Sequence, residues 1–213
     1  MKKSLLLCIV FTYCWLCARS AEAQTPERFD LSAYDTFTSG VFANFTYPAR
    51  PLFKGVGDAG RRKSFTLRHG LFRPRFNERG YIERLRAYLK SVEYADVTGD
   101  GHNEAIVAVG NICDCSGVWY GIYVYGLTGR KPARLLWAFQ TGDSAYGGLR
   151  RVYGHRGKLT VELYGSGSGP NLPPKSVNGS ACCTDDYTRR RYKWDGRRFV
   201  QEGKARLLLE REV

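Results

Sequence analysis

Short alternating runs of apolar and polar residues cover most of the chain, and they predict strands rather than helices. The runs are rich in β-branched, aromatic and aliphatic side chains, and Gly, Pro or Asp separates them. They span residues 42–47, 64–68, 105–109, 118–125, 133–139, 149–153 and 159–163. Gly-rich stretches at 54–63 and 165–179 predict loops. The pattern favours a mainly β fold, an antiparallel meander or hairpin sheet domain that is sandwich-like or a partial barrel, with at most one or two short helices.

The apolar residues of 81–92 are spaced in a way that fits both a helix and a strand. Aliphatic residues recur there at helical spacing, whereas the residues around Val92 and Tyr94 suit a strand. We expect a short helix or irregular turn first and a strand from about Ser91.

Residues 192–199 predict a β-hairpin with a two-residue turn, because Asp-Gly separates two alternating runs. Such a turn would set Lys193 opposite Arg198. The aromatic residues expected on the buried face are Tyr192, Trp194 and Phe199. The basic residues expected on the opposite face, as a candidate polyanion-binding patch, are Arg189, Arg191, Lys193 and Arg198. Like charges opposite each other need solvent, an acid or a bound anion.

The first 23 residues have the order of a secretory signal peptide: a basic start, an apolar run and a small-x-small end before Gln24. The apolar run is shorter than the roughly 20 residues that cross a membrane, so no transmembrane span is expected. We expect export to the periplasm or the outside. A lipoprotein anchor at Cys8 or Cys17 is the alternative.

The 213 residues carry a formal net charge of +13. We expect an irregular or β segment over 24–80 that packs on an antiparallel β domain over 81–213. The basic balance raises the expectation of an anionic glycan or cell-envelope component as partner, and no nucleic acid is expected for an exported protein. On charge alone, a well-solvated surface is the favoured explanation.

Four cysteines lie beyond the signal peptide: Cys113, Cys115, Cys182 and Cys183. Disulfides persist after export, so one or two bridges between distant segments are expected. Four cysteines permit three connectivities. A zinc site of four thiolates is the alternative, although zinc sites usually space their cysteines more widely.

An acidic stretch, "DVTGDGHNE", follows the strand that ends near residue 95. The candidate ligands of a calcium ion are Asp96, Thr98, Asp100, the carbonyl of His102, and Glu104. Val107 stands where a helix-loop-helix calcium site needs its last carboxylate, so only a loop between two strands is possible. The alternative is a plain turn, in which Asp96 and Thr98 accept amide hydrogen bonds and Glu104 faces water.

The same stretch resembles the calcium-binding hairpin of integrin-type and VCBS β-propeller repeats. The resemblance implies side-chain ligands at Asp96, Thr98, Asp100 and Glu104. There is one such loop, and the chain is too short for a propeller of such blades.

A second resemblance is to uncharacterised exported bacterial proteins with one such loop, loosely the LppP/LprE-like lipoprotein group. It rests on the loop, on "GGLR" at 147–150, and on "ACC" at 181–183 before the "YKWDG" of 192–196. It covers about residues 93–201 and implies a small exported β-domain of unknown role, without catalytic residues.

An enzyme is the less favoured class. No Gly-x-Ser-x-Gly elbow surrounds Ser166 or Ser168. A cell-envelope hydrolase would have to pair carboxylates such as Asp143, Asp185 and Asp186. The sequence therefore predicts a non-catalytic structural or interaction module, with calcium as a possible ligand and anionic-polymer binding as the alternative.

Overall fold

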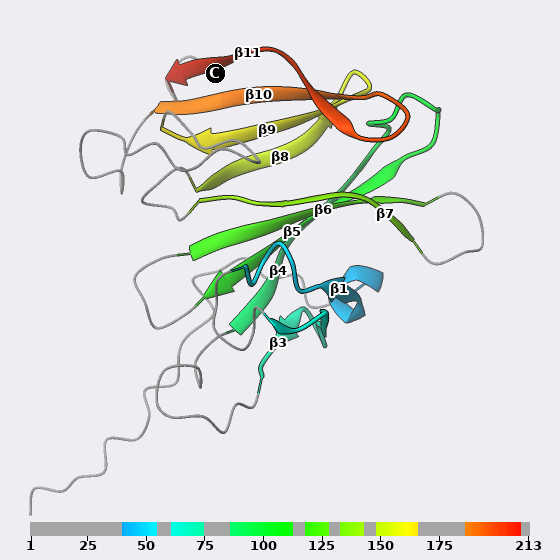
Figure 1. The fold of residues 1–213 in the computed structure, drawn as a ribbon, viewed down its shortest axis with the longest axis vertical. Coiled ribbons are helices and arrows are strands. Elements are labelled where there is room, and N and C mark those ends of the chain that lie inside the picture. Colours follow the sequence, from blue (N-terminus) through cyan, green and yellow to red (C-terminus); the bar gives the residue numbers. More distant parts are fainter. Residues whose placement is uncertain are drawn as a thin grey trace, which may run out of the picture. The chain divides into compact units, whose positions relative to one another are not determined.

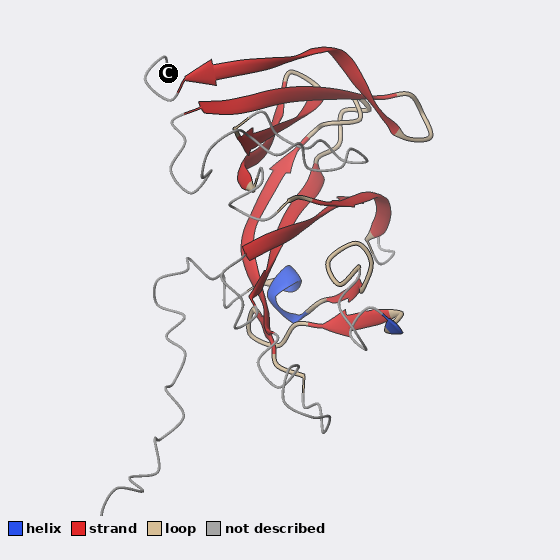
Figure 2. Ribbon diagram, turned by 60° about the vertical axis from the view of Figure 1, so that its left-hand side comes forward, coloured by secondary structure: helices blue, strands red, loops and turns tan. Residues whose placement is uncertain are grey.

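The structure, a computed structural model, describes residues 40–54, 61–74, 86–112, 118–127, 133–142, 148–165 and 186–209. They belong to one compact unit, Tyr34–Val213. The strands of this unit pair in antiparallel sheets, as Figure 1 and Figure 2 show, and the short 3-10 helix η1 (Val41–Asn44) precedes the first of them. The mainly β, antiparallel class predicted from the sequence is confirmed. None of the described residues forms a helix with the length and hydropathy needed to cross a membrane.

A five-stranded sheet has the order β3-β4-β5-β6-β7. Its strands are β3 (Leu71–Phe72), β4 (Arg86–Ala95), β5 (Glu104–Ile112), β6 (Val118–Gly126) and β7 (Arg134–Gln140). All residues of the central strand β5 are buried. Val107 faces one hydrophobic core and Ile106 faces another. Burial on both faces explains why β5 is a nearly continuous apolar run.

Strand β4 begins at Arg86, earlier than the predicted start near Ser91. Its pairing with β5 shifts between Leu89 and Ser91, which is a β-bulge. Because of this bulge, Leu89 and Val92 contact the same core although they lie three positions apart. That spacing is also the spacing of a helix, so the bulged strand accounts for part of the pattern that predicted a helix. The expected helix or turn over 81–85 lies outside the described residues.

The segment before β4 covers one face of this sheet with aromatic side chains. It contains η1, β1 (Thr46–Pro48) and β2 (Ser64–Thr66). Tyr47 stacks on Phe65 with 5.5 Å between ring centroids, and its hydroxyl donates to the Phe42 carbonyl at 2.7 Å. The predicted strand over 42–47 is wrong in its first half. Phe42 and Ala43 are both buried, and a helical turn allows this where neighbouring residues of a strand would point to opposite faces.

A four-stranded sheet has the order β11-β10-β9-β8. Its strands are β8 (Leu149–His155), β9 (Lys158–Tyr164), β10 (Asp186–Trp194) and β11 (Phe199–Leu209). The inner face of this sheet shares the second hydrophobic core with β5, β6 and β7 of the five-stranded sheet. The outer face therefore remains for polar and charged residues.

The two sheets approach closely where β8 meets β4. A methyl group at Gly154 would lie 2.2 Å from Cβ of Ala95 and 3.0 Å from Cγ1 of Val97. The backbone amide of Gly154 also donates to Oε1 of Glu93 at 3.2 Å. Gly154 is therefore required by space rather than by backbone conformation.

Candidate functional site

The hairpin of β10 and β11 places the basic residues, and its register differs from the predicted one. Trp194 pairs with Phe199, and Lys193 pairs with Val200 rather than with Arg198. The connection has four residues, 195–198, because the Asp195 carboxylate accepts the amides of Arg197 and Arg198 at 2.8 Å each. These amide hydrogen bonds lower the pKa of Asp195. An Asx-type turn has thus replaced the two-residue turn.

The aromatic face of the hairpin agrees with the prediction. Tyr192, Trp194 and Phe199 all contact the second hydrophobic core. Burial raises the pKa of Tyr192 to about 12, so its hydroxyl stays neutral at physiological pH. Arg198 lies in the turn, where its Nε is 3.7 Å from Oδ2 of Asp195, and it is not on the same strand face as Arg189, Arg191 and Lys193.

The outer face of the four-stranded sheet gathers positive charge from all of its strands. We call the following set the basic face: Arg150, Arg151, Lys158, Arg189, Arg191, Lys193, Lys204 and Arg206, with the acids Glu162 and Glu202 among them. The register places them together, since Glu162 is opposite both Arg151 and Arg189, and Arg191 is opposite Glu202. Basic residues outnumber acidic ones on this face.

A bulge in β11 brings two of these residues to the face. Between the pairs Arg191–Glu202 and Arg189–Arg206, β11 has residues 203–205 opposite a single residue of β10. Gly203 adopts a φ of 71°, which permits the irregularity. As a result Arg206 lies directly across from Arg189, and like charges in that arrangement repel.

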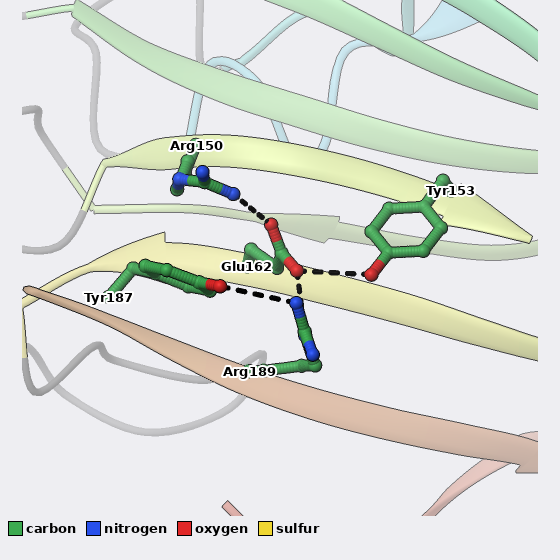
Figure 3. Close-up of polar contacts among 5 residues, drawn as sticks. All are labelled: Arg150, Tyr153, Glu162, Tyr187 and Arg189. Carbon is green, nitrogen blue, oxygen red and sulfur yellow. Dashed lines mark hydrogen bonds and ion pairs between the residues drawn. The ribbon is translucent and has the colours of Figure 1, made fainter. Parts of the chain in front are cut away.

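Glu162 holds the centre of the basic face (Figure 3). The side chain is 1% exposed. Its carboxylate accepts hydrogen bonds from Nη1 of Arg150, from the Tyr153 hydroxyl at 3.0 Å and from Nε of Arg189 at 2.7 Å. The Arg150 guanidinium lies 4.0 Å from the ring centroid of Tyr187, and Nη2 of Arg189 is 3.2 Å from the Tyr187 hydroxyl. A buried carboxylate thus fixes two guanidinium groups.

The pKa values of Tyr153 and Arg189 are both raised above their ordinary values. Burial raises the pKa of Tyr153, and the neighbouring Glu162 carboxylate acts in the same direction. Burial opposes the charge of Arg189, but its hydrogen bond to Glu162 and the surrounding groups outweigh that effect, so the pKa of Arg189 is raised. Arg189 is therefore a permanent cation and Tyr153 a permanent hydroxyl donor.

A groove of about 300 Å³ runs along β10 and β11 on this face. Its lining residues are Arg189, Arg191, Glu202, Gly203, Lys204 and Arg206. Glu202, the acid among them, accepts a hydrogen bond from Nζ of Lys158 at 2.6 Å, and this bond lowers the pKa of Glu202. The acid is already paired, so the groove presents an excess of positive charge.

The predicted calcium loop is a tight turn between β4 and β5. Asp96 accepts the amides of Gly99 at 2.6 Å and Gly101 at 3.0 Å on its two oxygens. Gly99 and Gly101 adopt φ values of 78° and 84°, as the turn requires. Asp100 accepts the amide of His102 at 2.9 Å. The loop therefore holds its shape with backbone donors.

Glu104 points into the protein, so the alternative in which it faces water is wrong. It is 1% exposed, and its Oε2 accepts the amides of Val97 at 2.9 Å and Thr98 at 3.1 Å. Burial raises the pKa of Glu104, and the two amide hydrogen bonds oppose that effect. The hydroxyl of Thr98 lies 3.3 Å from Oε1 of Glu104. In this geometry Thr98 serves as a donor to Glu104 rather than as an acceptor of turn amides.

Within the described ranges, no three His, Cys, Asp or Glu side chains converge in the arrangement of a metal site. The loop residues Asp96, Asp100 and Glu104 belong to those ranges. Each carboxylate oxygen has two lone pairs, so an amide hydrogen bond leaves one lone pair for a cation. Weak calcium binding by the loop stays a prediction.

Several predicted features lie outside the described residues. These are the signal peptide, the four cysteines Cys113, Cys115, Cys182 and Cys183, and the hydrolase candidates Asp143, Ser166, Ser168 and Asp185. The disulfides and the zinc alternative stay predictions. The three histidines lie on three separate elements: His69 in the turn before β3, His102 in the acidic turn and His155 at the end of β8.

Sequence reasoning missed Glu162, Lys204 and Arg206. Glu162 occupies an outward position in the alternation of β9, between Val161 and Leu163, so the pattern alone predicts a solvated acid and does not predict its burial beneath two arginines. Lys204 and Arg206 join the face only through the bulge, and Gly203 within a strand was its signal.

Comparison of the chain with models of protein families, with curated proteins and with solved structures finds no match. The function must therefore be inferred from the residues of the site.

Proposed function

We propose that the chain is a non-catalytic exported binding domain whose basic face holds an anionic polymer, such as an acidic polysaccharide of the cell envelope. The observation that carries the proposal is the pair Arg189 and Arg206, which face each other directly across the β10–β11 ladder in a groove that also contains Arg191 and Lys204. Glu162 is shared between Arg150 and Arg189, so the pair Arg189 and Arg206 keeps an excess of positive charge that solvent or a bound anion must compensate.

The surroundings of the groove support binding rather than simple solvation. Glu162 anchors Arg189 at 2.7 Å, so this guanidinium is held in place before any ligand arrives. Preorganised cations lose little side-chain entropy when they bind an anion. The face follows extended strands and is therefore suited to an extended polymer.

The test is retention of the full chain on immobilised polyuronate and on immobilised heparin, with neutral dextran as the reference matrix. We expect retention on both anionic matrices that falls steeply with salt, because salt screens exposed charges. The variant Arg191→Gln/Arg206→Gln should elute at much lower salt.

The matched control is Arg134→Gln/Arg197→Gln, which removes the same charge from exposed arginines outside the groove. It should elute close to the wild type. Equal loss of retention in both double variants would mean that net charge alone determines binding and would overturn the proposal.

A further inference from the structure

A second basic site lies between β2 and β3, and none of its described lining residues belongs to β8–β11. It is a pocket of about 650 Å³, which is within the range of roughly 300–1,000 Å³ of small-molecule sites. The described residues that line it lie between Arg62 and Arg73 and include Arg68, Leu71 and Phe72. No acidic residue is among these described lining residues.

The pocket is built on a turn that is fixed in place. His69 and Gly70 adopt φ values of 51° and 76°, the left-handed pair of a two-residue hairpin turn. The amide of His69 donates to Oδ1 of Asn44 at 3.0 Å, and the amide of Gly70 donates to the carbonyl of Ala43 at 2.8 Å. The Gly70 carbonyl in turn accepts the amide of Leu89 at 2.8 Å. Left-handed backbone at a non-glycine residue persists only where the surroundings hold it.

The walls of the pocket differ in character. Arg68 and Arg73 are exposed, and neither forms an ion pair with an acid in the described part of the chain. Leu71 and Phe72 are half-buried. The Arg62 guanidinium lies 5.9 Å from the ring centroid of Phe72, so cationic and apolar surfaces meet at one point.

We propose that this pocket binds a phosphate monoester, with the phosphate held by Arg68 and Arg73 and the ester group packed on Leu71 and Phe72. Guanidinium groups bind tetrahedral oxyanions through paired hydrogen bonds. A dianion matches the two exposed arginines Arg68 and Arg73, and no acid is among the described lining residues. The apolar wall selects an ester over inorganic phosphate. The site is independent of the basic face and shares no lining residue with its groove.

The test is calorimetric titration of the full chain with phenyl phosphate, inorganic phosphate and phenol. Phenyl phosphate should bind saturably and more tightly than inorganic phosphate, and phenol should not bind. The variant Arg68→Gln/Arg73→Gln should weaken phenyl phosphate roughly tenfold or more, as expected from the loss of charge-assisted hydrogen bonds. The control Arg134→Gln/Arg197→Gln should retain wild-type affinity. Equal affinity for the ester and inorganic phosphate, or equal loss in both variants, would overturn the proposal.

If the pocket variant folds poorly, the amide chemical shifts of the wild-type protein still test the proposal. Phenyl phosphate should shift the amides of Arg68 and Leu71, and shifts confined to β10 and β11 would contradict the site.

Vesicles of phosphatidylcholine with and without phosphatidic acid identify the source of the ligand. Retention by the acidic vesicles that is lost in Arg68→Gln/Arg73→Gln assigns a lipid headgroup, and binding of the free ester without vesicle retention assigns a soluble ligand. Polymer retention by the basic face should be unchanged in this variant.

Discussion

Arg189 donates from Nε to Oε1 of Glu162 at 2.7 Å, and Glu162 is 1% exposed while Arg189 is 26% exposed. The buried partner is thus the anion, and the cation reaches toward the surface. The same carboxylate also accepts from Arg150. An acid beneath a basic face therefore organises cations instead of only reducing the net charge.

Replacing Glu162 with Gln should lower the free energy of unfolding by about 3 kcal/mol, because removing one partner of a buried ion pair leaves the other charges uncompensated. It should also weaken retention on polyuronate at a given salt concentration, although the net charge becomes more positive. Urea denaturation and the salt concentration at elution measure the two effects.

Glu202→Gln is the matched control, since Glu202 is 42% exposed and pairs with Lys158 at the surface. Surface pairs contribute little to stability, so this variant should unfold like the wild type and bind the matrix at least as tightly. Stronger binding by Glu162→Gln would show that only charge matters and would refute the positioning role.

Gly154→Ala should lower the free energy of unfolding by about 1–3 kcal/mol through overpacking. The added Cβ would lie 2.2 Å from Cβ of Ala95, and each of the two strands is held by pairing within its own sheet. Adding Ala95→Gly should restore part of the loss. Gly126→Ala is the control, because its Cβ would meet Leu136 at an ordinary 3.5 Å. Equal effects of the two Gly→Ala changes in urea denaturation would contradict the close approach.

The sequence predicted most strands because their apolar runs are local signals. Runs such as 118–125 and 159–163 lie within β6 (Val118–Gly126) and β9 (Lys158–Tyr164). Errors occur where tertiary structure changes the side-chain period. The bulge after Leu89 gives a strand a helical spacing, and burial of both Phe42 and Ala43 converts the start of a predicted strand into η1.

The candidate site could be predicted only in part for a related reason. Arg189, Arg191 and Lys193 follow from alternation along β10 alone. The position of Arg206 opposite Arg189 depends on the four-residue turn at Asp195 and on the bulge at Gly203. Both features change the strand register, and the alternation of apolar and polar residues does not reveal either of them. In the acidic turn, the residue types identified Glu104, but its inward direction follows from the loop amides of Val97 and Thr98 that its carboxylate accepts.

Glu104 should make stability depend on pH in a defined direction. Burial raises its pKa above the usual 4.5 in the folded protein, so the folded state binds the proton more tightly than the unfolded state. The contribution of this group is therefore most favourable at low pH and declines as pH rises from about 4.5 through the folded pKa. Glu104→Gln keeps a carbonyl acceptor for the Val97 amide and removes the titration. Urea denaturation from pH 4 to 7 should show wild-type stability falling relative to the variant, and parallel curves would exclude the effect.

Calcium should raise the melting temperature of the chelator-treated protein, with a dissociation constant of about 10⁻⁴–10⁻³ M as in other extracellular modules. The reason is that Asp96 and Asp100 lie together in one turn, and each oxygen that accepts an amide retains a lone pair for the ion. Asp96→Asn/Asp100→Asn keeps oxygen acceptors for the turn amides and removes two charges, so it should fold but lose the calcium response.

Magnesium at the same ionic strength separates a specific site from screening, since Mg²⁺ requires a stricter octahedral shell. Absence of binding heat and of any shift in melting temperature at about 10 mM calcium, above the whole expected range of the dissociation constant, would leave the loop as a turn held by its own amides.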